Sequence, residues 1–199
     1  MAAVEGVDAV GKKTHSLLLA RWLRRKGVKT ALMSFPDYAT PTGKEIKNFL
    51  SSRRAYPIEL QHLLFAANRW EKANRIGSII GGGGVVIADR YTQSNLAYGK
   101  ANGLDVEWLA SLEKGLPAAD LVIILDAPSR SLSSRRPGRE KDAYERSPSL
   151  QDKAQKAYRE LARERGWKLI DAAGSVEDVE AAVLSTVKKA ISRDRGVTL

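Results

Sequence analysis

The sequence predicts a three-layer α/β domain, in which helices cover both faces of a parallel five-stranded sheet. Short runs rich in Val, Ile and Ala alternate with longer amphipathic stretches along the 199 residues, an order typical of parallel sheets with helical crossovers. A glycine-containing turn joins the first apolar run to the first amphipathic stretch. The chain shows no internal repeat and no low-complexity linker, and its length is that of about one domain. We therefore expect a single domain over residues 1–199.

Each strand and helix has its own sequence signal. Continuous apolar runs are typical of strands buried on both faces, and they predict strands over residues 2–5, 29–34, 85–88, 121–126 and 167–171. Apolar residues at helical spacing predict helices over residues 13–26, 43–51, 57–80, 92–100, 105–114, 149–165 and 175–193. The helix 57–80 is expected to be continuous, because Pro57 suits a first helical turn and the glycine run 81–84 follows its end.

The composition indicates a folded protein with an anionic partner. Hydrophobic residues make up 43% of the chain, which is enough for a buried core and excludes overall disorder. The absence of cysteine excludes disulfides, thiolate zinc sites and cysteine nucleophiles, and two histidines exclude a histidine-rich metal site. The formal charge of +10 favours nucleic acid, a membrane surface or a small phosphorylated ligand as partner.

The start of the chain carries no signal-peptide pattern. A basic region followed by an apolar core is absent from Met-Ala-Ala-Val-Glu-Gly. No run approaches the roughly 18 apolar residues that a bilayer-spanning helix needs. We expect a cytoplasmic protein that does not enter a membrane.

The residues after the first predicted strand form a phosphate-binding motif. Residues 6–12 read Gly-Val-Asp-Ala-Val-Gly-Lys, which fits G-x-x-x-x-G-K between a strand and a helix. The glycines allow backbone amides to curl around phosphate oxygens, and the helix N-terminus adds partial positive charge. Lys12 is expected to reach the terminal phosphates of a nucleotide. The residues assigned to ATP are Gly6, Val7, Asp8, Ala9, Val10, Gly11, Lys12, Lys13 and Thr14.

The residue after Lys12 departs from the motif. A Ser or Thr at this position normally ligates Mg²⁺ through its hydroxyl, but here the position holds Lys13, followed by Thr14. A protonated lysine cannot ligate a divalent cation, and its charge repels one. We therefore expect either that another group holds the metal or that metal handling is weakened.

A second ligand site is indicated on the predicted helix 57–80. Phe65 and Arg69 are four residues apart and therefore share one helix face. An aromatic face beside a guanidinium can stack a base and donate to its carbonyl edge, although Phe at helical spacing is also typical of a core. Asp89-Arg90-Tyr91 follows a predicted buried strand, where α/β sheets place ligand groups.

In order, these motifs resemble the thymidylate kinase family of P-loop nucleoside monophosphate kinases. Beside the phosphate loop, the resemblance rests on Phe35-Pro36-Asp37-Tyr38, Ala67-Asn68-Arg69-Trp70-Glu71, Asp89-Arg90-Tyr91, Ser94-Asn95-Leu96-Ala97-Tyr98 and Asp142-Ala143-Tyr144-Glu145. It runs to about Gln151, and the last helices fit in length and pattern only. It implies transfer of the γ-phosphoryl group of ATP to dTMP to give dTDP in dTTP synthesis. It also implies Mg²⁺ as cofactor and a homodimer formed through the helices near residues 43–80.

The resemblance implies roles around the nucleoside. Phe65 would stack on thymine, Arg69 would donate to its exocyclic oxygen, and Asn95 would read its imide edge. Tyr98 resembles the family tyrosine that packs under the sugar and disfavours a 2′-hydroxyl. The residues assigned to the acceptor nucleotide are Asp8, Phe35, Pro36, Tyr38, Phe65, Arg69, Arg90, Ser94, Asn95, Tyr98, Tyr144 and Gln151.

The resemblance also implies roles around the metal and the transferred group. Arg90 would bridge the acceptor phosphate and the incoming phosphoryl group, in a catalytic set that includes Lys12 and Asp8. Asp8 and Glu145 are similar to the acids that position the sugar hydroxyl and Mg²⁺. Asp89 is similar to the acid that supports the metal or its water shell.

The basic segment 135–147 resembles the family's lid. In this family the catalytic basic residue lies either in the phosphate loop or in the lid. Ala9 and Val10 are neutral, so the resemblance assigns this role to the lid, with Arg139 or Arg136 as the candidates. Donated arginines accelerate phosphoryl transfer by about 10³–10⁵ in analogous enzymes.

Two other functions remain open. Another nucleoside monophosphate or deoxynucleoside kinase would share the phosphate loop and the lid but prefer a different base. Because of Lys13, the chain could instead be a nucleotide-binding protein with little catalysis that binds nucleic acid through its basic surface. We favour the thymidylate kinase interpretation, in which ATP and dTMP are the partners and nucleic acid is not.

Overall fold

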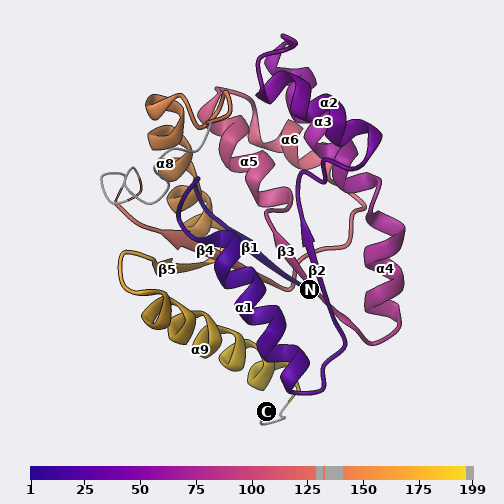
Figure 1. The fold of residues 1–199 in the computed structure, drawn as a ribbon, viewed down its shortest axis with the longest axis vertical. Coiled ribbons are helices and arrows are strands. Elements are labelled where there is room, and N and C mark those ends of the chain that lie inside the picture. Colours follow the sequence, from indigo (N-terminus) through magenta and orange to yellow (C-terminus); the bar gives the residue numbers. More distant parts are fainter. Residues whose placement is uncertain (129–131, 133–140, 196–199) are drawn as a thin grey trace.

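The structure, a computed structural model, describes residues 1–128, 132 and 141–195, and these residues form a parallel sheet with helices on both faces (Figure 1). The five strands stand in the order β2-β3-β1-β4-β5, and every neighbouring pair is parallel. They are β1 (Ala2–Glu5), β2 (Thr30–Ser34), β3 (Val85–Asp89), β4 (Leu121–Asp126) and β5 (Lys168–Asp171). The predicted fold class is confirmed, and each strand begins and ends within one residue of its predicted bounds.

Two groups of helices enclose the sheet. α1 and α9 pack against one another and against the strands, whereas α8 contacts β4 and β5 and packs against α5 (Figure 1). The helices are α1 (Lys12–Arg25), α2 (Pro41–Leu50), α3 (Ile58–Trp70), α4 (Ala73–Gly81), α5 (Thr92–Ala101), α6 (Val106–Leu112), α8 (Pro148–Arg165) and α9 (Val176–Arg195). Side-chain caps begin several of them: Thr40, Asp105 and Ser147 each accept from a backbone N–H in the first turn.

The predicted continuous helix 57–80 is wrong, because α3 ends at Trp70 and α4 begins at Ala73. At the break the chain tightens, and the N–H of Lys72 donates to the carbonyl of Arg69. The side chains at the break are held by the loop after β2 and by the first turn of α2: Lys72 pairs with Asp37 of the loop at 2.7 Å, and Thr42 of α2 donates to Glu71 at 2.8 Å. These contacts come from distant sequence, so the apolar periodicity does not reveal the break. The other described helices lie within two residues of their predicted bounds.

The strand order puts the phosphate loop where ligands bind in such sheets. β1 is central, with β3 on one side and β4 on the other. The chain passes from β1 to β2 on one side and later crosses to β4 on the other. Ligands of open α/β sheets bind beyond the carboxyl ends of the strands at such a switch point. The loop after β1 therefore lies at the expected position for a ligand site.

Part of the predicted lid lies outside the described residues. Arg136 and Arg139 belong to that part, and the described remainder of the lid, residues 141–147, leads into α8. Within the described ranges, no helix combines the length and the apolar character that crossing a membrane requires.

Candidate active site

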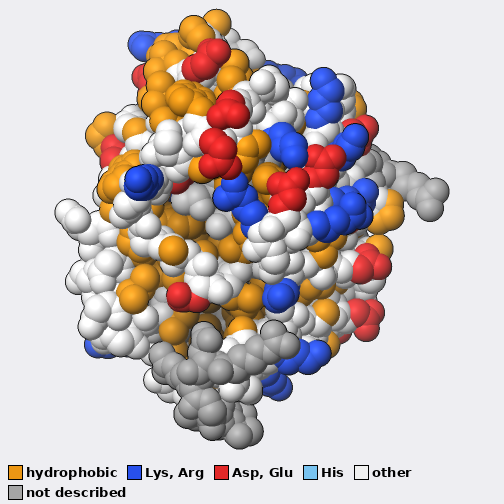
Figure 2. Space-filling model, turned by 180° about the vertical axis from the view of Figure 1, so that it is seen from behind, with side chains coloured by type: hydrophobic (Ala, Val, Ile, Leu, Met, Phe, Trp, Pro, Cys, Tyr) orange, Lys and Arg blue, Asp and Glu red, His pale blue; other side chains and the backbone are white. Residues whose placement is uncertain are grey.

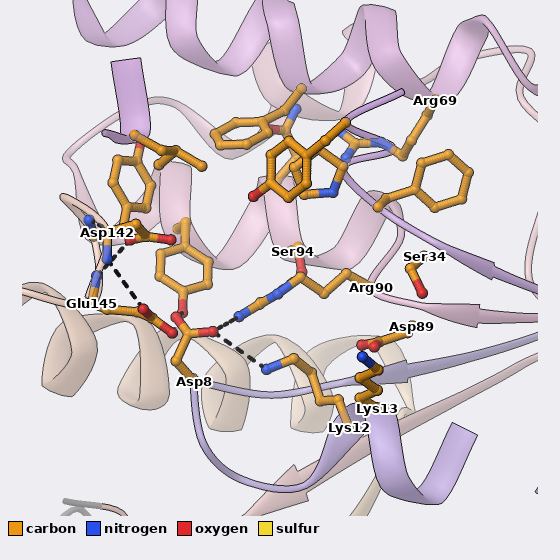
Figure 3. A pocket seen from close by; sticks show the side chains of 18 of the residues that line it. Asp8, Lys12, Lys13, Ser34, Arg69, Asp89, Arg90, Ser94, Asp142 and Glu145 are labelled. Atoms are coloured by element: carbon orange, nitrogen blue, oxygen red, sulfur yellow. Dashed lines mark hydrogen bonds and ion pairs between the residues drawn. The ribbon is translucent and has the colours of Figure 1, made fainter. Parts of the chain in front are cut away.

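A cavity of about 620 Å³ opens beyond the carboxyl ends of β1, β2 and β3 (Figure 3). The phosphate loop, the segments after β2 and β3, α3, α5 and residues 142–145 all contribute side chains to it. Its lining includes all the residues predicted to bind the acceptor nucleotide except Gln151, and also Lys12, Lys13, Asp89 and Glu145. Segments far apart in the sequence therefore converge on one cavity.

The phosphate loop has the backbone geometry that its glycines predict. Gly6 has φ 133°, and a Cβ there would lie 2.3 Å from the carbonyl oxygen of Leu125, so no other residue fits. Gly11 has φ 108° and stands directly before α1. The ammonium of Lys12 donates to the carbonyl of Val7 across the loop at 2.7 Å. The loop is thus curled, with the lysine drawn over it.

A charged cluster joins the phosphate loop to β3. Arg90 donates to Asp8 at 2.5 Å, and Lys12 lies 3.7 Å from the same carboxylate (Figure 3). Burial favours the neutral acid, but Arg90 and Lys12 hold the pKa of Asp8 well below its usual range. Burial, with Arg90 nearby, lowers the pKa of Lys12 to about 8. Arg90 and Lys12 share the carboxylate of Asp8. Glu5 and Asp89 lie near them as well, so neither cation is tied to an acid of its own.

Arg90 is held in an unusual backbone conformation. Its φ of 66° lies in the left-handed region, which is uncommon outside glycine. Its N–H donates to the carbonyl of Val4 at 3.0 Å, and its guanidinium contacts the carbonyl of Gly6 and the hydroxyl of Ser94. The turn therefore aims the guanidinium at the phosphate loop.

Glu5 supports this turn, although no sequence motif assigns it a role. It is fully buried at the end of β1 and accepts from the Tyr91 N–H at 2.6 Å and from the Ser94 hydroxyl at 2.6 Å. The Tyr158 hydroxyl donates to it at 2.9 Å. Burial raises the pKa of Glu5, although Arg90 opposes this. An acidic residue inside an apolar strand was the available signal.

The opposite end of the cavity is aromatic and amide-lined. The Phe65 ring stands edge-on to Phe49 at 5.5 Å and to Tyr144 at 6.1 Å. Asn95 is buried and contacts the buried His62, whose pKa burial lowers to about 4. Arg69 forms a buried ion pair with Glu113. Neither His62 nor Glu113 has a role in the sequence prediction, since only their distant partners reveal one.

Tyr98 connects the two ends. Its hydroxyl donates to Asp8 at 3.1 Å and lies 3.2 Å from the side-chain oxygen of Gln151. The amide of Gln151 donates to Asp8 and to the carbonyl of Tyr144. Gln151 thus supports the cavity from behind its lining. Arg90 stacks over the Tyr98 ring, 5.3 Å from its centroid.

Asn68 holds the wall formed by the loop after β2. Phe35 and Pro36 begin this loop, and Tyr38 stands half-exposed at its edge. The side chain of Asn68 is fully buried, accepts from the Asp37 N–H at 2.8 Å and donates to the Thr40 hydroxyl at 2.8 Å. The wall is therefore tied to α3, which also carries Phe65 and Arg69.

The carboxylates near the phosphate loop bear on metal binding. No three His, Asp or Glu side chains gather into a metal cluster in the described part of the chain. Asp8 is already engaged by Arg90, Lys12 and Tyr98. Asp89 lines the cavity on the same side as Lys13, away from Glu145 (Figure 3). Mg²⁺ commonly uses one or two carboxylates together with substrate phosphates and water, so Asp89 fits an Mg²⁺ that arrives with ATP.

The sheet order, the phosphate loop after β1 and the aromatic, amide-lined end of the cavity over α3 and α5 define a P-loop kinase that phosphorylates a small acceptor. Comparison with known proteins narrows this class. The thymidylate kinase family model matches residues 4–183. The chain is 38% identical to the thymidylate kinase of Schizosaccharomyces pombe, covering 94% of this chain and 90% of that protein. It is 37% identical to the thymidylate kinase of Arabidopsis thaliana, covering 94% and 70%. A solved thymidylate kinase from Candida albicans superposes with a TM-score of 0.86 at 27% identity, covering 97% and 92%. The chain belongs to the thymidylate kinase family.

Proposed function

We propose that this cavity carries out the family's reaction, with the phosphates of ATP at the loop after β1 and dTMP across α3 and α5. A phosphate oxygen of dTMP attacks the γ-phosphorus of ATP. The bond from the γ-phosphorus to the bridging oxygen breaks, and dTDP and ADP result. The attacking oxygen is already ionised at neutral pH, so the reaction needs no general base. The protein's contribution is to position the groups and neutralise charge.

The observation that carries the proposal is the placement of Arg90 between the two halves of the cavity. Its guanidinium contacts Asp8 of the phosphate loop and Ser94 of α5. The guanidinium can therefore contact the phosphoryl group while it is transferred from the donor half to the acceptor half. Lys12 stands on the donor side, and a lid arginine, Arg139 or Arg136, would add a further charge. Both candidate arginines lie outside the described residues.

The base end supports thymine as the acceptor base. Asn95 and Arg69 line the cavity together with Phe65. Phe65 offers an aromatic face, and the two polar side chains offer hydrogen bonds to a base edge. Tyr98, beneath the sugar position, would disfavour a 2′-hydroxyl. We assign Tyr144 to closing over the nucleoside, with Gln151 holding its backbone carbonyl from behind the lining.

Mg²⁺ would enter as a complex with ATP. Asp89 would hold it, directly or through water, with Glu145 on the acceptor side as a further carboxylate. When bound, the ion supplies positive charge to the phosphate oxygens. Lys13 occupies the position of the Ser or Thr whose hydroxyl normally follows the loop lysine, and Thr14 lies one residue further on. The phosphates themselves would therefore supply most of the metal's ligands.

The homodimer would form through α2 and α3. Leu60 and Leu63 of α3 are 38% and 42% exposed, and a contiguous exposed apolar patch is typical of an interaction surface. Apolar side chains gather at the end of the molecule that α2 and α3 form (Figure 2). On the same view, basic side chains alternate with acidic ones, which supports nucleotides rather than nucleic acid as the partner. A cytoplasmic location stays a prediction.

A monophosphate panel tests the proposal. The protein is incubated with ATP, Mg²⁺ and each of dTMP, dUMP, dCMP, dAMP and dGMP, and formation of the diphosphate is measured. We expect dTMP to react with the highest kcat/KM. A preference for another base would indicate a different nucleoside monophosphate kinase. No product with any acceptor, together with salt-sensitive DNA binding, would support the nucleic-acid alternative.

A further inference from the structure

Glu113 contacts two of the side chains proposed to read the base. It stands at the end of α6 and is only 8% exposed. Its two carboxylate oxygens accept from Nε and Nη2 of Arg69, the former at 3.0 Å. One of them also accepts from Nδ2 of Asn95 at 2.9 Å. A single carboxylate from one helix therefore touches side chains from α3 and α5.

Glu113 determines which way the Asn95 amide faces. A carboxylate beside an arginine acts only as an acceptor, so the NH₂ group of Asn95 must face it. The same NH₂ group lies 3.3 Å from the carbonyl of His62, which uses its second hydrogen. Oδ1 of Asn95 then faces Nδ1 of His62 at 2.7 Å, so Nδ1 must carry a proton. What Asn95 has left for a ligand is one acceptor lone pair on Oδ1.

The same carboxylate determines what Arg69 can offer. Nε and Nη2 are engaged by Glu113. Nη1 makes no hydrogen bond with another side chain or backbone group among the described residues, and Arg69 lines the cavity. Arginine has only donors. The base therefore meets N–H donors at Arg69 and an oxygen acceptor at Asn95.

We propose that Glu113 is a positioning residue that selects the base, because it makes Asn95 an acceptor and leaves Arg69 a donor toward the ligand. This pattern complements the edge of a pyrimidine with an N–H at position 3 and a carbonyl at position 4. It opposes cytosine, which has an acceptor and an amino group at those positions. The proposal rests on the proposed function, in which these two residues face the base.

His62 follows this arrangement and does not impose it. Its pKa of about 4, lowered by burial, keeps it neutral at pH 7. A neutral imidazole can move its proton to the other nitrogen and accept a turned amide. Glu113 has no such freedom, because turning the Asn95 amide would place an oxygen against its carboxylate. The amide of Asn102, 3.5 Å from Nε2 of His62, favours the same Nδ1–H form, so the effect of Glu113 is read from the change between the wild type and a Glu113 variant.

The test replaces Glu113 with its neutral isostere. Glu113→Gln keeps the size of the side chain but allows the contact with Asn95 to be donor or acceptor. Calorimetry measures the Kd of dTMP and of dCMP for the wild type and the variant. We expect the preference for dTMP over dCMP to fall by about tenfold or more. Glu107→Gln is the control, because it is the same change at an exposed position of α6, where the side chain pairs with Arg165 and does not line the cavity. Its preference should equal that of the wild type.

The His62 ring provides a second measurement that loss of packing alone would not reproduce. The chain has two histidines, so ¹⁵N-histidine spectra are simple, and His15→Gln assigns them. We expect the Nδ1–H form of His62 in the wild type and a mixture of both forms in Glu113→Gln. A wild type in the Nε2–H form, or a folded Glu113→Gln variant with unchanged preference, would overturn the proposal. If that variant does not fold, the wild-type spectrum decides. Failure of the proposed function would show separately, as no dTDP formation by the wild type.

Discussion

The two ends of the cavity are built differently. At the base end, Arg69, Glu113, His62 and Asn95 are all buried, and each is paired with another member of the group. The positive and negative charges there balance. At the phosphate end, Arg90 and Lys12 share the single carboxylate of Asp8, and Lys13 stands exposed beside them. The acids Glu5 and Asp89 also lie near these cations, so the charges there are shared among several groups and are not paired one to one.

The difference separates recognition from charge neutralisation. Reorienting a paired, buried group would leave a polar atom without a hydrogen-bond partner, which costs free energy. Such groups therefore present a fixed hydrogen-bond pattern to a base. Cations that share one carboxylate can instead turn to phosphate oxygens when a nucleotide arrives. We therefore expect substitutions at the base end to alter specificity, and substitutions at the phosphate end to alter rate, metal dependence and pH dependence.

The largest expected effect is at Arg90. Arg90→Ala removes the guanidinium that faces both halves of the cavity, and we expect kcat to fall by about 10³-fold or more. ATP binding, measured by calorimetry, should stay detectable because Lys12 and the loop amides remain. Arg90→Lys keeps the charge next to Asp8 and serves as the control for folding. Full turnover by a folded Arg90→Ala would remove Arg90 from the transfer step.

Next in size is the pH dependence of ATP binding. Lys12 binds phosphate in its charged form, and its pKa in the free protein is about 8, below the usual 10.5. Raising the pH through 8 therefore removes the charge, so the Kd of ATP should be flat below pH 8 and then rise toward about tenfold per pH unit. Lys12→Arg stays charged throughout and should lose this rise. An identical profile in Lys12→Arg would place the titration elsewhere.

A smaller effect is expected at Lys13. Lys13→Thr restores the hydroxyl of the motif and removes a cation near the metal position. We expect the Mg²⁺ concentration for half-maximal rate to fall by about fivefold, since two nearby charges interact by about 1 kcal/mol in water. Lys189→Thr is the control, because it makes the same change at an exposed position of α9, and its half-maximal Mg²⁺ concentration should equal that of the wild type. If the turnover of Lys13→Thr rose by orders of magnitude, Lys13 would instead be a strong inhibitor of catalysis in the wild type.

The smallest effect is expected at Tyr98, which connects the phosphate end and the base end of the cavity. Tyr98→Phe removes a hydroxyl that contacts Asp8 and Gln151. We expect the free energy of unfolding to fall by about 1 kcal/mol and the KM for dTMP to rise a few-fold, with the KM for ATP unchanged. Denaturant unfolding measures the free energy change, and initial rates measure the two KM values. Tyr56→Phe, which loses a hydrogen bond to Glu45 away from the cavity, is the control. An equal change in both KM values would contradict the assignment of Tyr98 to the acceptor side.

Much of this molecule follows from local sequence. The apolar runs predict all five strands, because strands buried on both faces must be apolar throughout. The phosphate loop and the segment after β3 are short motifs, and Asp8, Lys12 and Lys13 of the loop line one cavity with Arg90, Ser94 and Asn95. Their individual contacts with ATP, dTMP and Mg²⁺ stay predictions.

The break between α3 and α4 depends on tertiary contacts and not on local sequence. The apolar spacing of residues 57–80 continues through it, and the break lies where Glu71 pairs with the first turn of α2 and Lys72 with the loop after β2. A pattern of polarity along one segment contains no information about a partner 29 residues away.

The sequence alone therefore determined the α/β class, the position of the phosphate loop and most of the side chains around the cavity, because periodicity and motifs act over short spans. The tertiary structure alone decided how those side chains are oriented. Glu5 holds the Arg90 turn from 86 residues away, and Glu113 orients Arg69 from 44 residues away. Both acids are buried, and a buried carboxylate persists only where donors surround it. Those donors come from distant segments that meet only in the folded chain.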